Sequence, residues 1–516
     1  MHEDYILQSS PKGYSEDQDK SILPEETYQN AFYSLSKTFP DLNFTLTKLS
    51  NNEFYSVYDF DDGFFGSHGK GATQSQSMAS AIMEYSERKS WYEFDMGKAK
   101  GFIKASYNYL KDKVDMGSYK DIFKIHYYTE TESTEDILSG TDLLWVEGYN
   151  LTSDKPTLIP VNFTDLVKSS NGLAAGNTKE EAITQGLCEL IEREHIDNFL
   201  LDPYNAKVRL IDHSTLNNPY LLKLLEWATI KGIQIYFIDI SNTINVTTIL
   251  VHAIDHNSPN IYSRSGDGYG THNDPEKAMI RAFTEFLQGR EAYVNNFPED
   301  FDMTKGQWQT RLILDFTRII NNAKTISVKG CFHINSNDFK KDAEKILSIL
   351  KQKGHEVIAL NLTHKELKIP VYRLLIPTFK TGDEFSPFSR NQHYTVAFLL
   401  KNGRHDDKAW EYYLKYKKEI TEINEESTEL IRQINKHMGA NIDIDARQKE
   451  LLDKDVIYWL LMPRNHIVLF IFASYFTRAP LAAMSVLLGT TVVDGDKAVT
   501  LPELELELSQ KERSPS

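Results

Sequence analysis

The sequence is poor in cysteine, with only Cys188 and Cys331 among 516 residues. Two thiols allow at most one disulfide and exclude a cysteine-rich zinc site, and they are typical of a reducing compartment. Positive charge is also scarce, because 57 Lys and Arg residues stand against 73 Asp and Glu residues and leave a net charge of −16. This balance argues against general nucleic-acid binding and against docking on an anionic membrane. We therefore expect a cytoplasmic protein without a nucleic-acid partner.

The sequence also lacks an uninterrupted apolar run that could cross a membrane. Its most apolar region, 456–493, is broken by Pro463-Arg-Asn-His466 and by Arg478-Ala-Pro480, whereas a membrane-spanning helix needs about 20 apolar residues. The first 25 residues show no basic segment followed by an apolar one, so no secretory signal is predicted. We expect no membrane segment, and we expect residues 1–25 to be a disordered N-terminus.

Between its two ends the chain alternates between strand-like and helix-like stretches. Alternating residues at 44–49 and the apolar run at 234–240 predict strands, and the apolar face of 26–39 predicts a helix. This mixture predicts an α+β fold in which helices cover mixed sheets. We place that domain at 26–385. The apolar spacing becomes helical beyond it, so we predict an all-helical C-terminal domain at 386–516 with a loose acidic tail.

One polar pattern occurs three times in the predicted α+β domain. A polar residue is followed four residues later by glutamate and three residues after that by glutamate or glutamine. On an α-helix these offsets fall on one face. The three copies start at Ser80, Gln185 and Arg281, and they continue with Glu84 and Glu87, with Glu189 and Glu192, and with Glu285 and Gln288.

The starts of the three predicted helices match as well. Thr73, Thr178 and Asp274 each stand eleven residues before the first glutamate of their segment. The two threonines open capping-box sequences, and Asp274 is followed by a proline that suits the first helical position. Small-residue stretches containing glycine precede all three, and we predict that they are loops. One unit of glycine-containing loop, cap and acidic helix is therefore predicted three times.

Three acidic helix faces that converge would repel one another unless cations neutralised them. Carboxylate oxygens suit Mg²⁺, and Mg²⁺ in turn suits a polyphosphate. Helix N-termini and glycine-rich loops offer N–H donors to phosphate oxygens. The alternative is three ordinary amphipathic helices with solvated acidic faces, which is what a single such pattern usually means. Three copies in register with matching caps favour a shared site.

These segments resemble the three signatures of the YcaO family. The first runs from Gly69 to Arg88, the second from Ser170 to Arg193 and the third from Arg281 to Arg290. The resemblance extends over approximately residues 30–380. It implies a YcaO-type ATP-binding fold in which three acidic helices hold Mg²⁺ and the nucleotide phosphates. It also implies an activity, the phosphorylation of a peptide backbone amide oxygen so that a nucleophile can replace it.

The resemblance assigns roles to particular residues. It implies that five glutamates ligate or position Mg²⁺, namely Glu84, Glu87, Glu189, Glu192 and Glu285. It implies that ATP is bound by Lys70, Ser80, Arg88, Asn171, Arg193, Arg281, Gln288 and Arg290. The arginines either contact phosphates or pair with the carboxylates, and the sequence leaves both alternatives open. No covalent protein nucleophile is required, so no catalytic residue is assigned.

The end of the sequence bears on the branch of the family. Members that form azolines typically end in Pro-x-Pro-x-Pro, whereas this sequence ends in Ser-Pro-Ser. The signatures look closest to the branch without a fused partner domain, which is linked to methylthiolation of a ribosomal protein.

The expected function is ATP- and Mg²⁺-dependent activation of an amide in a peptide or protein substrate, for heterocyclisation, thioamidation or related chemistry. The alternative is an ATP-binding accessory factor that serves a partner modification enzyme. A leader-peptide-binding partner and a homodimer are also compatible with the sequence.

Overall fold

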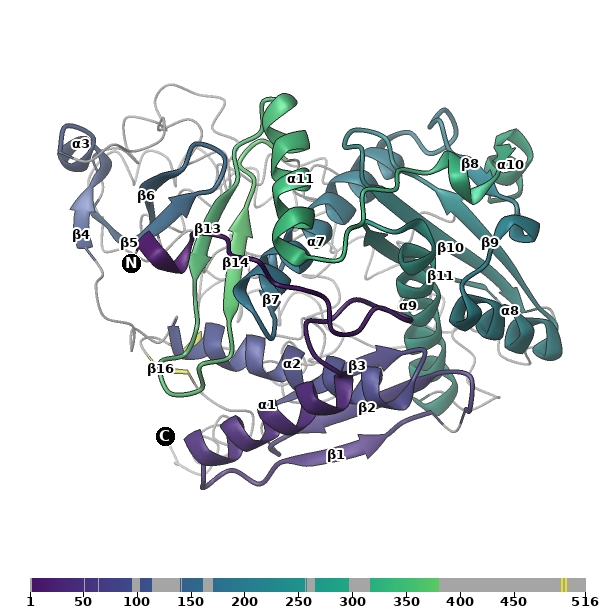
Figure 1. Ribbon diagram of the computed structural model, residues 1–516, viewed down its shortest axis with the longest axis horizontal. Coiled ribbons are helices and arrows are strands. Elements are labelled where there is room, and N and C mark those ends of the chain that lie inside the picture. The colour runs from purple at the N-terminus through teal and green to yellow at the C-terminus, as the bar shows by residue number, and fades with distance from the viewer. Residues whose placement is uncertain are drawn as a thin grey trace, which may run out of the picture.

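The computed structural model describes the chain up to residue 379 with gaps, together with two short strands near the C-terminus (Figure 1). The described ranges are 2–50, 52–63, 65–94, 103–113, 140, 142–160, 170–255, 257, 265–296 and 316–379, and the two strands are β15, Val493–Asp494, and β16, Lys497–Ala498. Apart from these two strands, the helical domain predicted at 386–516 lies outside the described residues.

Besides the two-stranded sheet of β15 and β16, the described residues form three sheets. The first has the antiparallel order β1-β2-β3, with strands Thr45–Lys48, Ser56–Asp61 and Gly66–Gly71. The second has the order β11-β10-β9-β8-β12, with strands Ser265–His272, Thr247–Asp255, Ile233–Asp239, Arg209–Ile211 and Lys324–Ile326. The third has the order β4-β5-β13-β14-β7, with strands Ile103–Ser106, Asp142–Asn150, Ile358–Asn361, Val371–Leu375 and Leu173–Ala175, and β6, Lys155–Pro160, pairs with β5. In this part of the chain β3, β7 and β11 are each the edge strand of their sheet.

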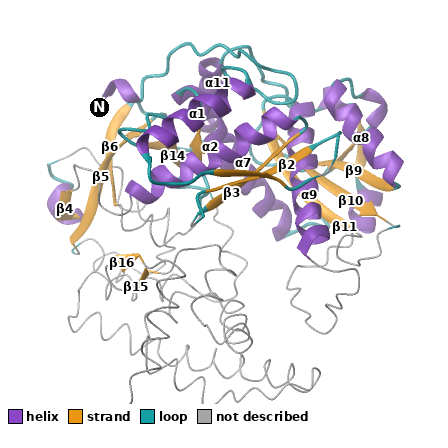
Figure 2. Cartoon of the chain, turned by 90° about the horizontal axis from the view of Figure 1, so that it is seen from below, coloured by secondary structure: helices purple, strands orange, loops and turns teal. Residues whose placement is uncertain are grey.

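Helices pack on the faces of these sheets (Figures 1 and 2). The long ones are α1 Pro24–Thr38, α2 Gln74–Glu93, α7 Lys179–Leu201, α8 Pro219–Lys231, α9 Pro275–Asn296 and α11 Phe339–Gln352, and the short ones are α3 Tyr107–Leu110 and α10 Phe316–Asn322. One core joins α1 and α2 to the first sheet, a second joins α8 and α9 to the second sheet, and a third joins α7 and α11 to the third sheet. Because antiparallel pairs dominate and β8 and β12 are parallel, the predicted α+β fold with mixed sheets is confirmed.

The predicted repeated unit is present three times, as β3–α2, β7–α7 and β11–α9. Thr73 and Thr178 cap their helices by accepting hydrogen bonds at 3.2 Å from the backbone N–H groups of Gln76 and Glu181. Asp274 accepts one at 2.9 Å from the backbone N–H of Glu276. The three helix starts predicted from capping residues are therefore confirmed.

The small-residue stretches before the caps are edge strands over much of their length, so the prediction of loops was wrong. A Cβ atom on Gly69 would lie 2.1 Å from the backbone oxygen of Ser77 in α2, and one on Gly268 would lie 2.1 Å from that of Ala282 in α9. Glycine is needed there because the strand lies directly on the helix backbone. The glycines thus let each helix pack closely against its own edge strand.

Residues 8–21, here called the N-terminal strap, were predicted to be disordered but pack against the N-terminal ends of several helices. The backbone N–H of Gln8 donates to Glu180 of α7 at 2.7 Å, and the oxygen of Ser10 accepts from the N–H of Phe339 of α11 at 2.9 Å. Further on, Glu16 accepts a hydrogen bond from the Tyr220 hydroxyl of α8. The polar composition of this segment led to the prediction of disorder. The segment is ordered because the polar groups at the ends of these helices form hydrogen bonds with it.

A buried ionic cluster fixes the strap in place. The Lys12 ammonium lies 2.6 Å from a carboxylate oxygen of Asp19 and 2.6 Å from one of Asp342. Asp19 also pairs with Lys277 of α9 and lies 3.3 Å from the Nε2 atom of His272. Because these groups are almost fully buried and mutually paired, the strap belongs to the folded core.

Both cysteines are buried and free. Among the described residues, no helix combines the length and apolarity needed to cross a membrane.

Candidate functional site

The polar stripes of α2, α7 and α9 carry residues at matching positions, counted from the N-cap. Offsets of three, seven, eleven and fourteen residues place four side chains along one face of each helix. In α2, positions three, seven, eleven and fourteen hold Gln76, Ser80, Glu84 and Glu87. In α7 the same positions hold Glu181, Gln185, Glu189 and Glu192. In α9 they hold Lys277, Arg281, Glu285 and Gln288. The α2 and α7 stripes are predominantly acidic, whereas α9 adds two cations.

At position eleven, carboxylates bind the edge strand of their own unit. Glu189 accepts a hydrogen bond at 3.2 Å from the backbone N–H of Gly172, which immediately precedes β7. Glu285 accepts one at 3.4 Å from the N–H of Tyr269 in β11. These contacts anchor the acidic stripes of α7 and α9 to the strands beside them.

At position fourteen, side chains reach the edge strand of another unit. Glu87 of α2 accepts a hydrogen bond at 3.2 Å from the backbone N–H of Ala175 in β7. Gln288 of α9 donates one at 3.3 Å to the backbone oxygen of His68 in β3. Arg281 of α9 donates another at 2.8 Å to Gln185 of α7. The three units are therefore linked to one another, and the region where these position-seven, position-eleven and position-fourteen side chains meet is hereafter called the acidic cleft.

Basic side chains pair with the acids of the cleft. The Lys70 ammonium lies 3.4 Å from Glu285, and Arg88 pairs with Glu84 one helical turn away. The Arg193 guanidinium lies 4.0 Å from Glu189 and 3.9 Å from Glu192. The structure thus brings the five predicted glutamates together with Lys70, Arg88, Arg193 and Arg281, while Ser80 lies on the same stripe of α2 and Asn171 lies next to Gly172.

Arg290 is placed elsewhere. Its guanidinium donates a hydrogen bond at 3.1 Å to Asp255 of β10 and lies 5.9 Å from the centre of the Trp227 ring. The reason is geometric, because Arg290 stands sixteen residues after the N-cap and so leaves the stripe that contains Glu285 and Gln288.

Three carboxyl groups of the cleft, those of Glu87, Glu189 and Glu192, have raised pKa values and so hold their protons more tightly than ordinary glutamates. Burial, followed by the charge of Glu189, raises the pKa of Glu87 well above its usual value. Burial also raises the pKa of Glu189 to about 7, although Arg193 acts in the opposite direction. Burial and then the neighbouring Glu285 raise the pKa of Glu192. The cluster is therefore short of positive charge, which a bound cation would supply.

The donor set fits Mg²⁺ better than a cation that needs a complete protein cage. In the described part of the chain, no three His, Cys, Asp or Glu side chains are already grouped closely enough to hold a metal ion. Mg²⁺ usually takes one or two carboxylates and completes its shell with water and phosphate oxygens. Separated carboxylates with basic side chains between them suit that mode of binding.

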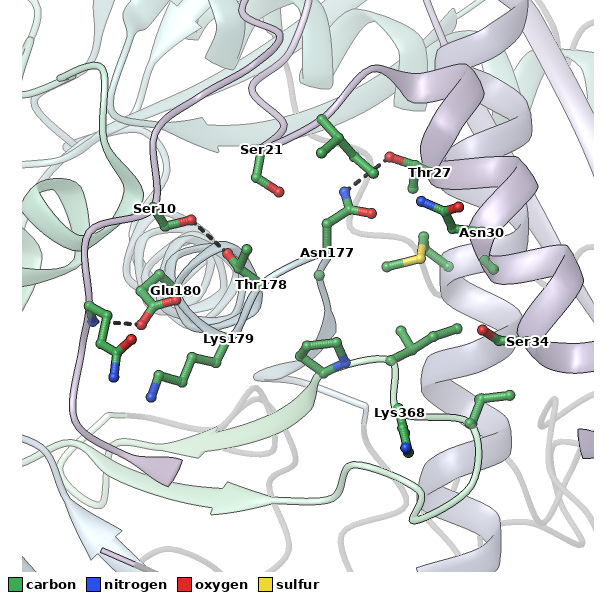
Figure 3. A pocket seen from close by; sticks show the side chains of 18 of the residues that line it. Ser10, Ser21, Thr27, Asn30, Ser34, Asn177, Thr178, Lys179, Glu180 and Lys368 are labelled. Atoms are coloured by element: carbon green, nitrogen blue, oxygen red, sulfur yellow. Dashed lines mark hydrogen bonds between the residues drawn. The ribbon is translucent and has the colours of Figure 1, made fainter. Parts of the chain in front are cut away.

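A cavity of about 570 Å³ lies beside the N-terminal end of α7, between the strap, α1 and the segment before β14 (Figure 3). Its polar lining includes Ser21, Thr27, Asn30, Asn177 and Lys368. The Asn177 amide donates at 3.0 Å to the Thr27 hydroxyl and at 3.2 Å to Glu181, the residue at position three of α7. The cavity therefore adjoins one end of the acidic stripe.

Sequence reasoning missed this cavity and treated Glu181 only as part of a capping box. Glu181 instead accepts hydrogen bonds from the backbone N–H of Ser21 at 3.0 Å and from its hydroxyl at 2.8 Å. The spacing was the available signal, because Glu181, Gln185, Glu189 and Glu192 continue one stripe back to the N-cap.

These observations define a class, an α+β protein in which three strand–helix units enclose an acidic cleft with basic residues. The family model described as YcaO cyclodehydratase, ATP- and Mg²⁺-binding, matches residues 68–380. That match covers more than half of the sequence, and the chain belongs to the YcaO family. The expected ATP and Mg²⁺ are the ligands in the description of this family.

Relatives and solved structures agree with this assignment. An uncharacterized protein from Methanothermobacter thermautotrophicus is 29% identical over 335 residues, which is 60% of this chain and 80% of that protein. The ribosomal protein S12 methylthiotransferase accessory factor YcaO from Escherichia coli is 29% identical over 242 residues, which is 43% of this chain and only 40% of that protein.

Among solved structures, a heterocyclase in complex with substrate and cofactor matches with a TM-score of 0.60 and 21% identity, over 73% of this chain and 54% of that chain. YcaO from Methanopyrus kandleri bound with AMPPCP and Mg²⁺ matches with a TM-score of 0.54 and 18% identity, over 73% of this chain and 96% of that chain. These structures confirm the YcaO-type fold.

Proposed function

We propose that this protein uses ATP and Mg²⁺ to phosphorylate a backbone amide oxygen of a peptide or protein, so that a nucleophile can replace that oxygen. The observation that carries the proposal is the convergence of Glu84, Glu87, Glu189, Glu192 and Glu285 on one cleft with raised pKa values at three of them. Membership of a family described as ATP- and Mg²⁺-binding cyclodehydratases supports the ligands and this kind of chemistry.

The asymmetry between the helices suggests how the ligands are divided. The acidic stripes of α2 and α7 would hold Mg²⁺, which neutralises phosphate charge when it is bound. Lys70 and Arg281 stand on the α9 side of the cleft and would bind phosphate oxygens, and Gln288 would help to position them. Arg88, Arg193, Ser80 and Asn171 would complete the nucleotide site. We leave Arg290 out of the site, because its contact with Asp255 gives it a structural role.

The cavity beside Asn177 would receive the nucleoside part of ATP. Its volume of about 570 Å³ lies within the range of ordinary ligand pockets. It adjoins Glu181 at one end of the stripe, whereas the carboxylates that would hold Mg²⁺ lie two to three helical turns further along α7. Nucleoside and phosphates would therefore occupy successive parts of one elongated site.

Calorimetric titration with ATP, with and without Mg²⁺, tests the proposal. We expect Mg²⁺-dependent binding to the wild type and a loss of at least tenfold in affinity for Glu84→Gln, since a carboxylate would be removed from the metal site. Glu344→Gln is a matched control, because Glu344 pairs with Lys340 on the exposed face of α11. A folded wild-type protein that does not bind MgATP would refute the proposal.

The alternative function is that of an ATP-binding accessory factor for a partner modification enzyme. The name of the E. coli relative favours it. Phosphate release with purified protein and candidate peptides distinguishes the two functions, because an accessory factor would leave the peptide unmodified without its partner. A leader-peptide-binding protein added to the same assay would show whether such a partner is needed.

A further inference from the structure

The pair formed by His68 and Asp59 lies beside the acidic cleft and has no role in the function proposed so far. In β3 the side of the strand that carries Gly69 and Gly71 packs against α2. The alternation of a strand places His68 and Lys70 on the opposite face. His68 therefore shares its face of the strand with Lys70, whose ammonium reaches Glu285 at 3.4 Å.

One hydrogen bond fixes the level of His68 along the cleft. Its backbone oxygen accepts the hydrogen bond of Gln288 at 3.3 Å, which puts it beside position fourteen. The His68 side chain is 60% exposed. Space is also open at Gly289, the residue after Gln288, because a Cβ atom there would meet no described atom within 4 Å. Position three is at the other end of the stripes, where the strap contacts Glu181 and Lys277. Among the described residues, His68 therefore stands at the open end of the cleft.

Asp59 lies beside the imidazole. The two residues are direct cross-strand partners in β2 and β3, and Nδ1 of His68 lies 3.3 Å from a carboxylate oxygen of Asp59. A carboxylate at this distance favours the tautomer that carries its proton on Nδ1, and the lone pair of Nε2 is then left to accept another proton. Asp61 on β2 also acts on the charge of Asp59, and on the same face of β3 the next side chain is that of Lys70, which pairs with Glu285 on α9.

A proton acceptor is needed at this place if the proposed function holds. Addition of a nucleophile X–H across the amide carbonyl gives X–C–O–H, and this oxygen must lose its proton when it forms a bond to the γ-phosphorus and ADP leaves. The cleft carboxylates are poor acceptors in this step, because they would be ligating Mg²⁺. Imidazole is the side chain that exchanges a proton near neutral pH.

We propose that His68 Nε2, with Asp59 beside Nδ1, accepts the proton of the oxygen that attacks the γ-phosphorus. This inference rests on the proposed function. When no peptide is present, water takes the place of the attacking oxygen and its proton goes to the same nitrogen.

Proximity is tested without turnover by NMR of protein labelled at histidine ¹³Cε1, with the signal of His68 assigned from His68→Gln. Addition of the non-hydrolysable AMPPCP with paramagnetic Mn²⁺ should broaden the His68 signal. The signal of His355, which bonds Thr378 beyond the C-terminal end of α11, should stay sharp. A sharp His68 signal in protein that binds Mn²⁺ and AMPPCP would overturn the role of His68 alone, whereas absence of binding would refute the proposed function itself.

Steady-state ATP hydrolysis tests the proton transfer. His68→Gln should lower kcat roughly 10²-fold, the size typical of a lost general base, with KM unchanged, and should flatten the rise of kcat with pH. Asp59→Asn should give an intermediate loss, and the matched control His355→Gln should behave as the wild type. The assignment is overturned if His68→Gln retains the wild-type kcat and pH profile, if it changes KM instead, or if the wild type binds MgATP without hydrolysing it.

Discussion

Glu189 is expected to destabilise the metal-free protein at alkaline pH, and Glu189→Gln is expected to remove that cost. Burial raises the pKa of this carboxyl to about 7 from an ordinary 4.5, although Arg193 and the N–H of Gly172 favour the ionised form. Glutamine keeps the size of the side chain and an oxygen that can accept the hydrogen bond from Gly172. The substitution therefore isolates the effect of charge.

The magnitude follows from the linkage between protonation and folding. Because the pKa of Glu189 is higher in the folded state, the folded state binds more protons between about pH 4.5 and 7, and stability falls across that interval as pH rises. A pKa difference of one unit corresponds to about 1.4 kcal/mol, so the full cost above pH 7 is roughly 3 kcal/mol. The side chain is 21% exposed, and solvent screening reduces the expected cost to about 2 kcal/mol.

Urea unfolding in the presence of a chelator, at pH 5.5 and pH 8.5, measures this effect. We expect Glu189→Gln to gain stability relative to the wild type by roughly 1 to 2 kcal/mol more at pH 8.5 than at pH 5.5. The control Glu344→Gln should show no such difference, because Glu344 is exposed. A glutamine variant that is less stable than the wild type at pH 8.5 would refute the reasoning, since the contacts with Gly172 and Arg193 would then outweigh burial.

Three further predictions concern packing, the strap and the two arginines. Gly268→Ala should destabilise the fold by about 3 kcal/mol or more in thermal unfolding, because its Cβ would meet the Ala282 backbone, whereas Gly289→Ala should stabilise α9 by roughly 0.5–1 kcal/mol. Asp19→Asn should cost about 3–5 kcal/mol in urea unfolding, because Lys12 and Lys277 would remain buried without their shared carboxylate. Arg193→Gln should weaken MgATP binding in calorimetry, while Arg290→Gln should lower the melting temperature and leave the affinity unchanged; equal losses of affinity would contradict the structural role of Arg290.

The repeated helices could be predicted because their determinants are local. Caps at Thr73, Thr178 and Asp274 fix where each helix begins, and the period of the α-helix then fixes which side chains share a face. The same reasoning explains why Glu84, Glu189 and Glu285 were found together. Arg290 was assigned to the ATP site by its position in a motif, whereas in the structure two further residues of α-helix turn it away from the stripe and toward Asp255.

The strap, the cavity and the edge strands could not be predicted because their determinants are distant in the sequence. Lys12 forms a buried ion pair with Asp342, and Ser21 donates a hydrogen bond to Glu181. Neither pair of residues belongs to a periodic pattern that could be recognised in the sequence. The glycines of β3 and β11 looked like loop residues, since close packing of a strand on a helix requires the same residue type as a turn. Chemistry that depends on His68 and Asp59 likewise appears only when β2 and β3 are paired.

The strap also constrains the order in which the protein can mature during its synthesis. It is synthesised before the helices that it contacts, because its contacts with Glu180, Lys277 and Phe339 need segments that are made much later. The hydrogen bond between Ser10 and Asp338 alone spans 328 residues. The part of the strap around Ser10 must therefore stay undocked while most of the domain emerges, because its partners in and next to α11 are made last. The strap is thus fully docked only when the described domain has been synthesised as far as α11.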